Sequence, residues 1–160
     1  MSHSDIEIFP IEPGDKRLSQ VAELFRELYA SEMEFGLSLP LVEGGEFLWI
    51  KSVEKILGKY AQIIVAVDAG MIVGFSYGSI RITPPYFGAK AIGYWEAMML
   101  RKPYRKRGIG DEMTRQLMNW WRSRKVCLFE GERLVNNCNA ERNFERLGFK
   151  IELVKYRREA

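Results

Sequence analysis

The strongest constraint on the fold is a pair of apolar segments joined by a short turn in the middle of the chain. Residues Ala61 to Val67 form a continuous run rich in β-branched side chains, and Met71 to Ile82 form a second apolar run. Between them stands Asp68-Ala69-Gly70, which is typical of the turn of a β-hairpin. The sequence therefore predicts two antiparallel strands here.

Other segments predict helices and further strands on both sides of this hairpin. Apolar residues recur at helical spacing after Pro13-Gly14-Asp15, from Leu18 to Tyr29. Further helices are expected over 47–57, from Ile109 to about residue 125, and over 139–147, and further strands over 6–11, 91–100, 126–135 and 149–156. This order indicates an α+β fold with a twisted, mixed and mostly antiparallel sheet of six or seven strands, flanked by about four helices, with one parallel crossover.

Length and composition limit the class of protein. A chain of 160 residues with 47% hydrophobic side chains fits a single domain over 1–160 that buries a substantial core. No apolar run reaches the length of a membrane span, and the N-terminus lacks the order of a signal peptide. We therefore expect a cytoplasmic protein with no membrane partner.

The reactive residues exclude several chemistries. Cys127 and Cys138 have no CxxC partner or neighbouring histidine, so we expect reduced thiols at small buried positions and no metal site. The only histidine is His3, in a polar N-terminal stretch. This disfavours every mechanism that needs a histidine base, and a cysteine that carries an acetyl group is disfavoured for the same reason.

A basic, glycine-containing turn stands between the strand over 91–100 and the helix after it. Five of the seven residues from Arg101 to Arg107 are basic, and Gly108 and Gly110 follow, although the net charge of the chain is only +3. Glycines let a backbone approach a ligand closely, and the start of a helix offers free N–H groups to an anion. The turn is either a phosphate cradle or a solvated basic rim. Since acidic residues interleave elsewhere, a small polyanion fits better than a nucleic acid.

A second motif follows near the C-terminus. It consists of Asn137-Cys138-Asn139-Ala140, then Phe144 and Leu147-Gly148-Phe149. Together with Arg105-Lys106-Arg107-Gly108-Ile109-Gly110, it resembles the GNAT superfamily of N-acetyltransferases, whose motifs read Q/R-x-x-G-x-G/A and N-x-x-A-x-x-x-Y-x-x-x-G-F. The resemblance covers nearly the whole chain, and it implies a GNAT-like fold and acetyl-coenzyme A as co-substrate.

The resemblance also implies which residues hold the coenzyme. Backbone N–H groups over 106–111 would bind the pyrophosphate, and main-chain groups at the end of the strand would pair with the pantetheine arm. Asn137 would orient that arm, with Phe144 packed beside it. The implied cofactor-binding set is Met98, Met99, Leu100, Arg105, Lys106, Arg107, Gly108, Ile109, Gly110, Asp111, Asn137, Ala140 and Phe144.

For the chemistry, Glu96 is the candidate general base, since some GNAT enzymes place a glutamate nine residues before this arginine. An apolar setting beside Trp95 and Met98 would raise its pKa, and the alternative is a surface or salt-bridged strand glutamate. The backbone N–H of Met98 would hold the oxyanion. Phe144 departs from the family pattern, because the usual tyrosine there is thought to protonate the leaving thiolate. Tyr94, Tyr104, a water, or unassisted departure would replace it.

The acceptor is expected to be a primary amine of a small molecule or peptide. The main candidate substrate residues are Tyr29, Glu34 and Trp95, with Glu32, Met33, Phe35, Tyr86 and Phe87 as further candidates. Acidic and aromatic side chains suit a cationic acceptor. The alternatives are a non-catalytic module that binds acetyl-coenzyme A as a sensor, and a nucleic-acid binder. A homodimer is also possible, with Trp121 and Phe129 as exposed apolar contacts.

Overall fold

A computed structural model describes residues 5–160, and His3 lies outside them. Five strands form one sheet in the order β1-β2-β3-β4-β5. The strands are β1 (Glu7–Pro10), β2 (Ala61–Asp68), β3 (Met71–Ile82), β4 (Ala91–Leu100) and β5 (Leu128–Gly131), and the helices are α1 (Leu18–Met33), α2 (Gly45–Glu54), α3 (Ile109–Ser123) and α4 (Cys138–Arg146). Neighbouring strands are antiparallel except β4 and β5, which are parallel. The single parallel crossover is thus confirmed.

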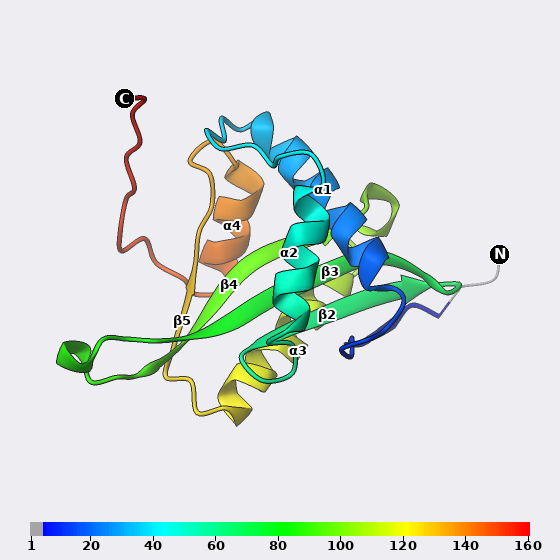
Figure 1. Cartoon of the computed structure of the whole chain (residues 1–160), viewed down its shortest axis with the longest axis horizontal. Coiled ribbons are helices and arrows are strands. Elements are labelled where there is room, and N and C mark those ends of the chain that lie inside the picture. The colour runs from blue at the N-terminus through cyan, green and yellow to red at the C-terminus, as the bar shows by residue number, and fades with distance from the viewer. Residues whose placement is uncertain (1–4) are drawn as a thin grey trace.

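Helices cover both faces of the sheet, with α1 and α2 in front and α3 behind (Figure 1). The alternation of β2 explains this, because Ile63 and Val65 pack with α1 and α2 while Ile64 and Ala66 pack with α3. All four side chains are at most 1% exposed. The continuous apolar run of β2 is therefore the signature of a strand buried on both faces.

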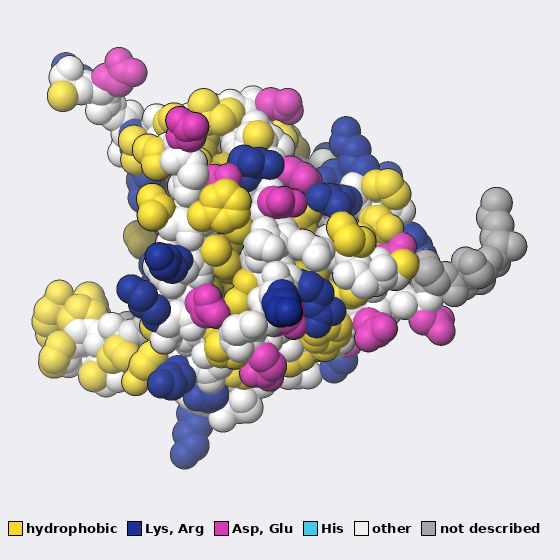
Figure 2. All heavy atoms as spheres, turned by 45° about the vertical axis from the view of Figure 1, so that its right-hand side comes forward, with side chains coloured by type: hydrophobic (Ala, Val, Ile, Leu, Met, Phe, Trp, Pro, Cys, Tyr) yellow, Lys and Arg dark blue, Asp and Glu magenta, His cyan; other side chains and the backbone are white. Residues whose placement is uncertain are grey.

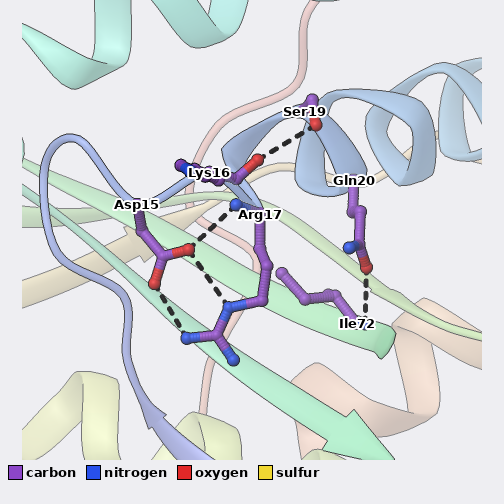
Figure 3. Close-up of polar contacts among 6 residues, drawn as sticks. All are labelled: Asp15, Lys16, Arg17, Ser19, Gln20 and Ile72. Carbon is purple, nitrogen blue, oxygen red and sulfur yellow. Dashed lines mark hydrogen bonds and ion pairs between the residues drawn. The ribbon is translucent and has the colours of Figure 1, made fainter. Parts of the chain in front are cut away.

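Polar contacts fix the start of α1 on the sheet (Figure 3). The carboxylate of Asp15 accepts two hydrogen bonds from the Arg17 side chain and one from the Arg17 backbone N–H. One turn later, the side chain of Gln20 accepts a hydrogen bond of 2.8 Å from the backbone N–H of Ile72 in β3. These contacts set where the other end of α1, which carries Tyr29 and Glu32, lies over the sheet.

The rear face of the sheet is shaped for one large side chain, Trp121 of α3. A Cβ atom at Gly78 or Gly93 would lie only 2.4 or 2.6 Å from this ring, so glycines are needed beneath it. The indole N–H donates to the backbone oxygen of Ser79, and the side chain is fully buried. The expectation that Trp121 is an exposed dimer contact is therefore wrong. The i+4 repeat continues from Met113 and Leu117 to this residue rather than to Trp120.

Two irregularities mark the middle of β4. Tyr77 of β3 lies opposite Ala97 and Gly78 lies opposite Trp95, so Glu96 between them is an extra residue, a β-bulge. The parallel ladder with β5 runs only from Ile92 to Trp95. β5 ends at Gly131, opposite Trp95, so β4 continues past Trp95 with no strand on this edge, and the bulge lies where the pairing stops.

The sheet is smaller than the sequence predicts. The strand expected over 126–135 is limited to the four residues of β5, and the strand expected over 149–156 is not formed. Residues 5–160 therefore form five strands, and the expected six or seven is wrong. The prediction of about four helices is confirmed.

Candidate active site

The basic turn has the backbone of an anion cradle. After β4 comes a short 3-10 turn over Lys102–Tyr104, then Lys106 with a φ of 59° and Gly108 with a φ of 78°. Gly108 precedes α3, and its carbonyl accepts the hydrogen bond of the Glu112 N–H. The N–H groups of the residues before Glu112 therefore have no helix carbonyl to bond and face outward from the helix start. A Cβ at Gly108 would meet nothing within 4 Å, so there is open space here.

The charged side chains around this turn have distinct partners. Arg105 donates its Nε–H to the backbone oxygen of Leu100 at 2.7 Å, which ties the turn to the end of β4. Asp111 forms an ion pair of 2.6 Å with Arg146 of α4. Lys106 and Arg107 are exposed. Arg105 and Asp111 thus shape the site, while the outer basic residues leave it positively charged.

The end of β4 has one unpaired edge. Met98, Met99 and Leu100 pair with β3, but the ladder with β5 ends before them. Their side chains pack into the core on the two faces of the sheet. A Cβ at Gly110 would lie 2.8 Å from Cε of Met98, so α3 packs closely against this strand. The free edge and the helix start are therefore adjacent.

The second motif builds α4 and one wall beside the end of the β4–β5 ladder. The side-chain oxygen of Asn137 accepts the Ala140 N–H at 3.1 Å, so this asparagine is the N-cap of α4. Phe144 lies edge-on to Trp95, with ring centres 5.5 Å apart. A Cβ at Gly131 would lie 2.7 Å from the Phe144 ring. Phe144 thus packs where the pairing of β4 and β5 stops.

Glu96 has polar neighbours, and the expected apolar setting is wrong. Its carboxylate accepts a hydrogen bond of 2.7 Å from the Ser79 hydroxyl and one of 3.1 Å from Arg81. Both groups come from β3, and the contact with Arg81 is an ion pair, so Glu96 is a salt-bridged strand glutamate. The side chain of Glu96 is 30% exposed. Glu96 is therefore an oriented carboxylate that is open to solvent, on the side of the sheet away from Trp95.

A second group of polar side chains adjoins Glu96. The Arg81 guanidinium lies 3.4 Å above the centre of the Tyr94 ring, and the Tyr94 hydroxyl hydrogen-bonds to Glu132. This bond lowers the pKa of Glu132, and burial raises the pKa of Tyr94 well above its ordinary value. Tyr94 is therefore a protonated donor at neutral pH.

The end of α1 adds two titratable side chains near this group, Tyr29 and Glu32. Burial raises the pKa of the half-buried Tyr29, and the nearby charges of Glu32, Glu96 and Glu132 raise it further. Burial also raises the pKa of Glu32. The charges of three carboxylates, from α1, from β4 and from the residue after β5, therefore act on one tyrosine hydroxyl.

The structure distributes the candidate acceptor residues unevenly. Tyr29 joins the group described above, whereas Glu34 is exposed at the end of α1. Trp95 is 6% exposed and donates to the hydroxyl of Ser76, which makes it a packing residue. Tyr86 and Phe87 were also expected to contact the acceptor. Instead they lie in the 3-10 turn at the tip of the β3–β4 hairpin, which projects away from the sheet (Figure 1).

Some functional candidates escaped the sequence motifs. Ser79, Arg81 and Glu132 belong to no motif, and Tyr94 was noted only as a possible acid. The period-two alternation of β3 could have placed Ser79 and Arg81 on one face. Glu132 carries no such signal, because it follows β5 in an irregular segment. The two cysteines, expected to be buried, are both exposed.

Comparisons with known proteins identify the family. The family described as "Acetyltransferase (GNAT) domain" matches residues 59–151, more than half of the chain. Among solved structures, aminoglycoside N-acetyltransferase AAC(6')-Iy in complex with CoA is similar, with a TM-score of 0.77 and 14% identity over 99% of this chain and 98% of that one. An acetyltransferase of Trypanosoma brucei is similar with a TM-score of 0.70 and 22% identity, over 98% of this chain and 100% of that one.

AAC(6')-Iy has also been solved with the bisubstrate analogue CoA-S-monomethyl-acetylneamine, with a TM-score of 0.76 and 14% identity over 98% of this chain and 100% of that one. The search of curated proteins found no match. Within residues 5–160, no helix combines the length and the apolar character needed to cross a membrane. The family match covers more than half of the chain, and the similar structures share its fold. The chain therefore belongs to the GNAT family of acetyltransferases.

Proposed function

We propose that the protein transfers the acetyl group of acetyl-coenzyme A to a primary amine of a cationic acceptor, with Glu96 as general base. One observation carries this proposal. Glu96 is the extra residue of the β4 bulge, so its carboxylate stands outside the strand ladder at the point where the pairing of β4 and β5 stops. Ser79 and Arg81 hold it there.

The donor side rests on the turn before α3 and on the free edge of β4. The N–H groups over 109–111 suit a pyrophosphate, and the positive end of the α3 dipole adds to their attraction. The unpaired edge over 98–100 suits the amide groups of a pantetheine arm. The CoA named in the complexes of AAC(6')-Iy supports this assignment.

In the proposed step, the neutral amine attacks the carbonyl carbon of the thioester. The N–C bond forms as the C–S bond breaks, and the sulfur leaves with the bonding electrons as coenzyme A thiolate. Glu96 accepts the proton that the nitrogen releases, and the N–H of Met98 stabilises the oxyanion. Phe144 can donate no proton, the Tyr94 hydroxyl is engaged with Glu132, and the Tyr104 hydroxyl donates to Asp68 at 2.7 Å. The thiolate therefore leaves without a protein acid or takes its proton from water.

On the acceptor side, Glu32 and Glu132 are suited to bind an ammonium group while Glu96 faces the reacting amine. Tyr29 offers a ring and a hydroxyl among these carboxylates. Carboxylates in a partly buried site attract a polycation strongly and repel anions. The aminoglycoside acceptor in the name of AAC(6')-Iy belongs to this chemical class.

The test is the variant Glu96→Gln, which keeps the size of the side chain and removes its basicity. Against a panel of amines that includes diamines and amino sugars, we expect kcat to fall by about 10²-fold or more. Binding of coenzyme A by calorimetry should be unchanged. Glu23→Gln, on the exposed side of α1, is the matched control and should retain full activity.

A non-catalytic sensor of acetyl-coenzyme A is the second candidate, and Phe144 at the usual tyrosine position favours it. A sensor would bind coenzyme A with the same residues and would acetylate no amine in the panel. Tight binding without turnover by the unmodified protein would therefore establish the sensor and refute Glu96 as a base. Turnover that Glu96→Gln leaves intact would refute the base assignment alone.

A further inference from the structure

The β3–β4 hairpin ends in an exposed apolar tip. Ile82, Tyr86 and Phe87 are 62%, 80% and 67% exposed, and the rings of Tyr86 and Phe87 lie 4.9 Å apart. The tip projects away from the sheet (Figure 1), and hydrophobic side chains gather on it at the lower left of the space-filling view (Figure 2). No charged residue occurs from Ile82 to Ala89. The tip is therefore an apolar surface that extends beyond the core of the protein.

The backbone of this tip is hydrogen-bonded mainly within itself. Over residues 83–90, five N–H groups donate to oxygen atoms of the same loop; they belong to Thr83, Phe87, Gly88, Ala89 and Lys90. Two further residues, Pro84 and Pro85, have no N–H group. Irregular backbone is costly to remove from water mainly because of its unsatisfied polar groups. This tip can therefore enter an apolar medium at a lower cost than an ordinary loop.

The base of the hairpin is formed by three segments: 58–60, 80–91 and 122–128. The Ile80 N–H of β3 donates to the backbone oxygen of Tyr60 at 2.7 Å. Arg124, just after α3, donates from its guanidinium to the backbone oxygen of Gly58, also at 2.7 Å. The three segments therefore lie together where the hairpin leaves the sheet.

The base is basic throughout. The three segments contain no acidic residue, although the chain has 21, and their basic residues are Lys59, Arg81, Lys90, Arg122, Arg124 and Lys125. Arg81 is paired with Glu96. The other five are exposed, and none of them forms an ion pair with a carboxylate within residues 5–160. Five cations thus surround the base of an uncharged tip, and they attract an anionic surface.

We propose that this hairpin docks the protein on an anionic lipid surface. The apolar side chains of the tip enter the interfacial layer, which aromatic residues favour, and the five cations of the base contact the headgroups. A nucleic acid fits less well, because its phosphates need cations among the contacting residues and the tip has none from Ile82 to Ala89. The expectation of no membrane partner rested on the lack of a span, and a docked tip needs no span.

Docking through the tip leaves the proposed coenzyme site accessible. β4 begins at the hairpin with Ala91 and ends at Leu100, directly before the basic turn. A strand of ten residues spans roughly 30 Å, since each residue adds about 3.4 Å. The lipid contact and the coenzyme site therefore lie toward opposite ends of β4, and the two can be occupied at the same time.

The first test measures co-sedimentation of the full chain with vesicles of phosphatidylcholine, with and without phosphatidylglycerol. The double variant Tyr86→Ser with Phe87→Ser removes both rings and leaves the backbone hydrogen bonds of the tip in place. It should lower partitioning onto the anionic vesicles by about tenfold or more. The matched control is Leu39→Ser with Val42→Ser, which changes two side chains that are 66% and 68% exposed between α1 and α2. The control should bind as the unmodified protein does.

The second test concerns the charges. Arg122→Gln with Lys125→Gln should lower binding to the anionic vesicles about tenfold, and added salt should weaken binding of the unmodified protein. The matched control, Arg157→Gln with Arg158→Gln, removes the same charge from the exposed C-terminal segment and should change binding far less. Thermal melts of every variant check that its fold is intact.

Absence of binding to the anionic vesicles would overturn the proposal, as would equal binding to vesicles of phosphatidylcholine alone. Binding that survives the substitutions at Tyr86 and Phe87, or that the substitutions at Leu39 and Val42 abolish, would also overturn it. Fluorescence anisotropy with a labelled single-stranded oligonucleotide completes the test, because tight binding that requires Tyr86 and Phe87 would assign this end to a nucleic acid instead. No acetyl-coenzyme A or amine is present, so no outcome depends on acetyl transfer.

Discussion

The turn before α3 and the cluster of carboxylates around Glu96 both lie along β4, but they are built from different parts of the chain. The turn is contiguous, runs from Arg101 to Gly110, and offers mainly backbone groups whose direction is set by positive φ angles. The cluster around Glu96 is formed by side chains of α1, of β3, of β4 and of the residue after β5. The donor site therefore depends on backbone conformation, and the acceptor site depends on packing between distant elements.

After Glu96→Gln, the largest effect should come from Gly108→Val. Gly108 and Gly58 have φ angles of 78° and 79°, and neither would place a Cβ within 4 Å of another atom. A β-branched residue is strained at both positions, so each variant should lose about 1–2 kcal/mol of stability or more. Only Gly108→Val should weaken coenzyme A binding, by about tenfold or more, since about 1.4 kcal/mol corresponds to a factor of ten.

Calorimetric titration with coenzyme A, after thermal melts have matched the two variants, makes this comparison. Equal affinities in Gly108→Val and Gly58→Val would mean that the turn does not hold the coenzyme. The contrast between a donor site built from backbone groups and an acceptor site built from side chains would then be wrong.

Two serines of β3 give the next effect. Ser79→Ala removes the 2.7 Å hydrogen bond to Glu96, so kcat should fall roughly fivefold, as expected for about 1 kcal/mol. Ser76→Ala removes the acceptor of the buried Trp95 N–H and should cost about 1–3 kcal/mol of stability while kcat stays unchanged. Steady-state kinetics and urea unfolding of both variants separate the roles. Loss of kcat in Ser76→Ala alone would reverse the assignment.

A smaller effect is expected for Tyr94→Phe. The variant keeps the ring beneath Arg81 and removes the hydroxyl that hydrogen-bonds to Glu132. The acceptor KM should rise about threefold, because a single hydrogen bond of this kind contributes a free energy of that size to binding. Neither kcat nor the affinity for coenzyme A should change. An altered affinity for coenzyme A would show that the two sites are not separate.

The smallest effect is a pH dependence. Burial raises the pKa of Glu32, whereas the Tyr94 hydrogen bond lowers that of Glu132. As pH falls, Glu32 is therefore neutralised first, and the acceptor KM should rise a few-fold while Glu132 remains charged. Glu32→Gln should have a higher KM at neutral pH and should lose this dependence. KM measured against pH for both proteins checks the prediction, and parallel profiles would contradict it.

The same contrast explains what could be predicted from the sequence. Gly108, Gly110 and the basic residues before them form a local pattern, because a turn that presents its backbone needs particular residues at fixed spacing. The β2–β3 hairpin and the four helices were predicted for a similar reason, since their periodicity is local. Arg81 and Glu132 act only through contacts with residues far along the chain, and local patterns do not encode such contacts.

Two errors have physical causes of the same kind. Trp121 was expected at the surface because its burial depends on Gly78 and Gly93, which lie on other elements. The segment over 149–156 has the pattern of a strand, but it pairs with no strand of the described residues. The β-strand propensity of residues 149–156 led to the prediction, but the absence of a paired strand left the segment without a ladder.

The bulge at Glu96 has a consequence for how the protein could change. Trp95 and Ala97 lie opposite consecutive residues of β3. A chain that lacks Glu96 would therefore pair as a regular ladder, and each remaining side chain of β4 would keep its present face. The sheet is complete without this residue. Deleting it would remove the proposed base and leave each neighbouring residue of β4 opposite its present partner in β3, so the bulge adds the carboxylate to the sheet without setting its pairing.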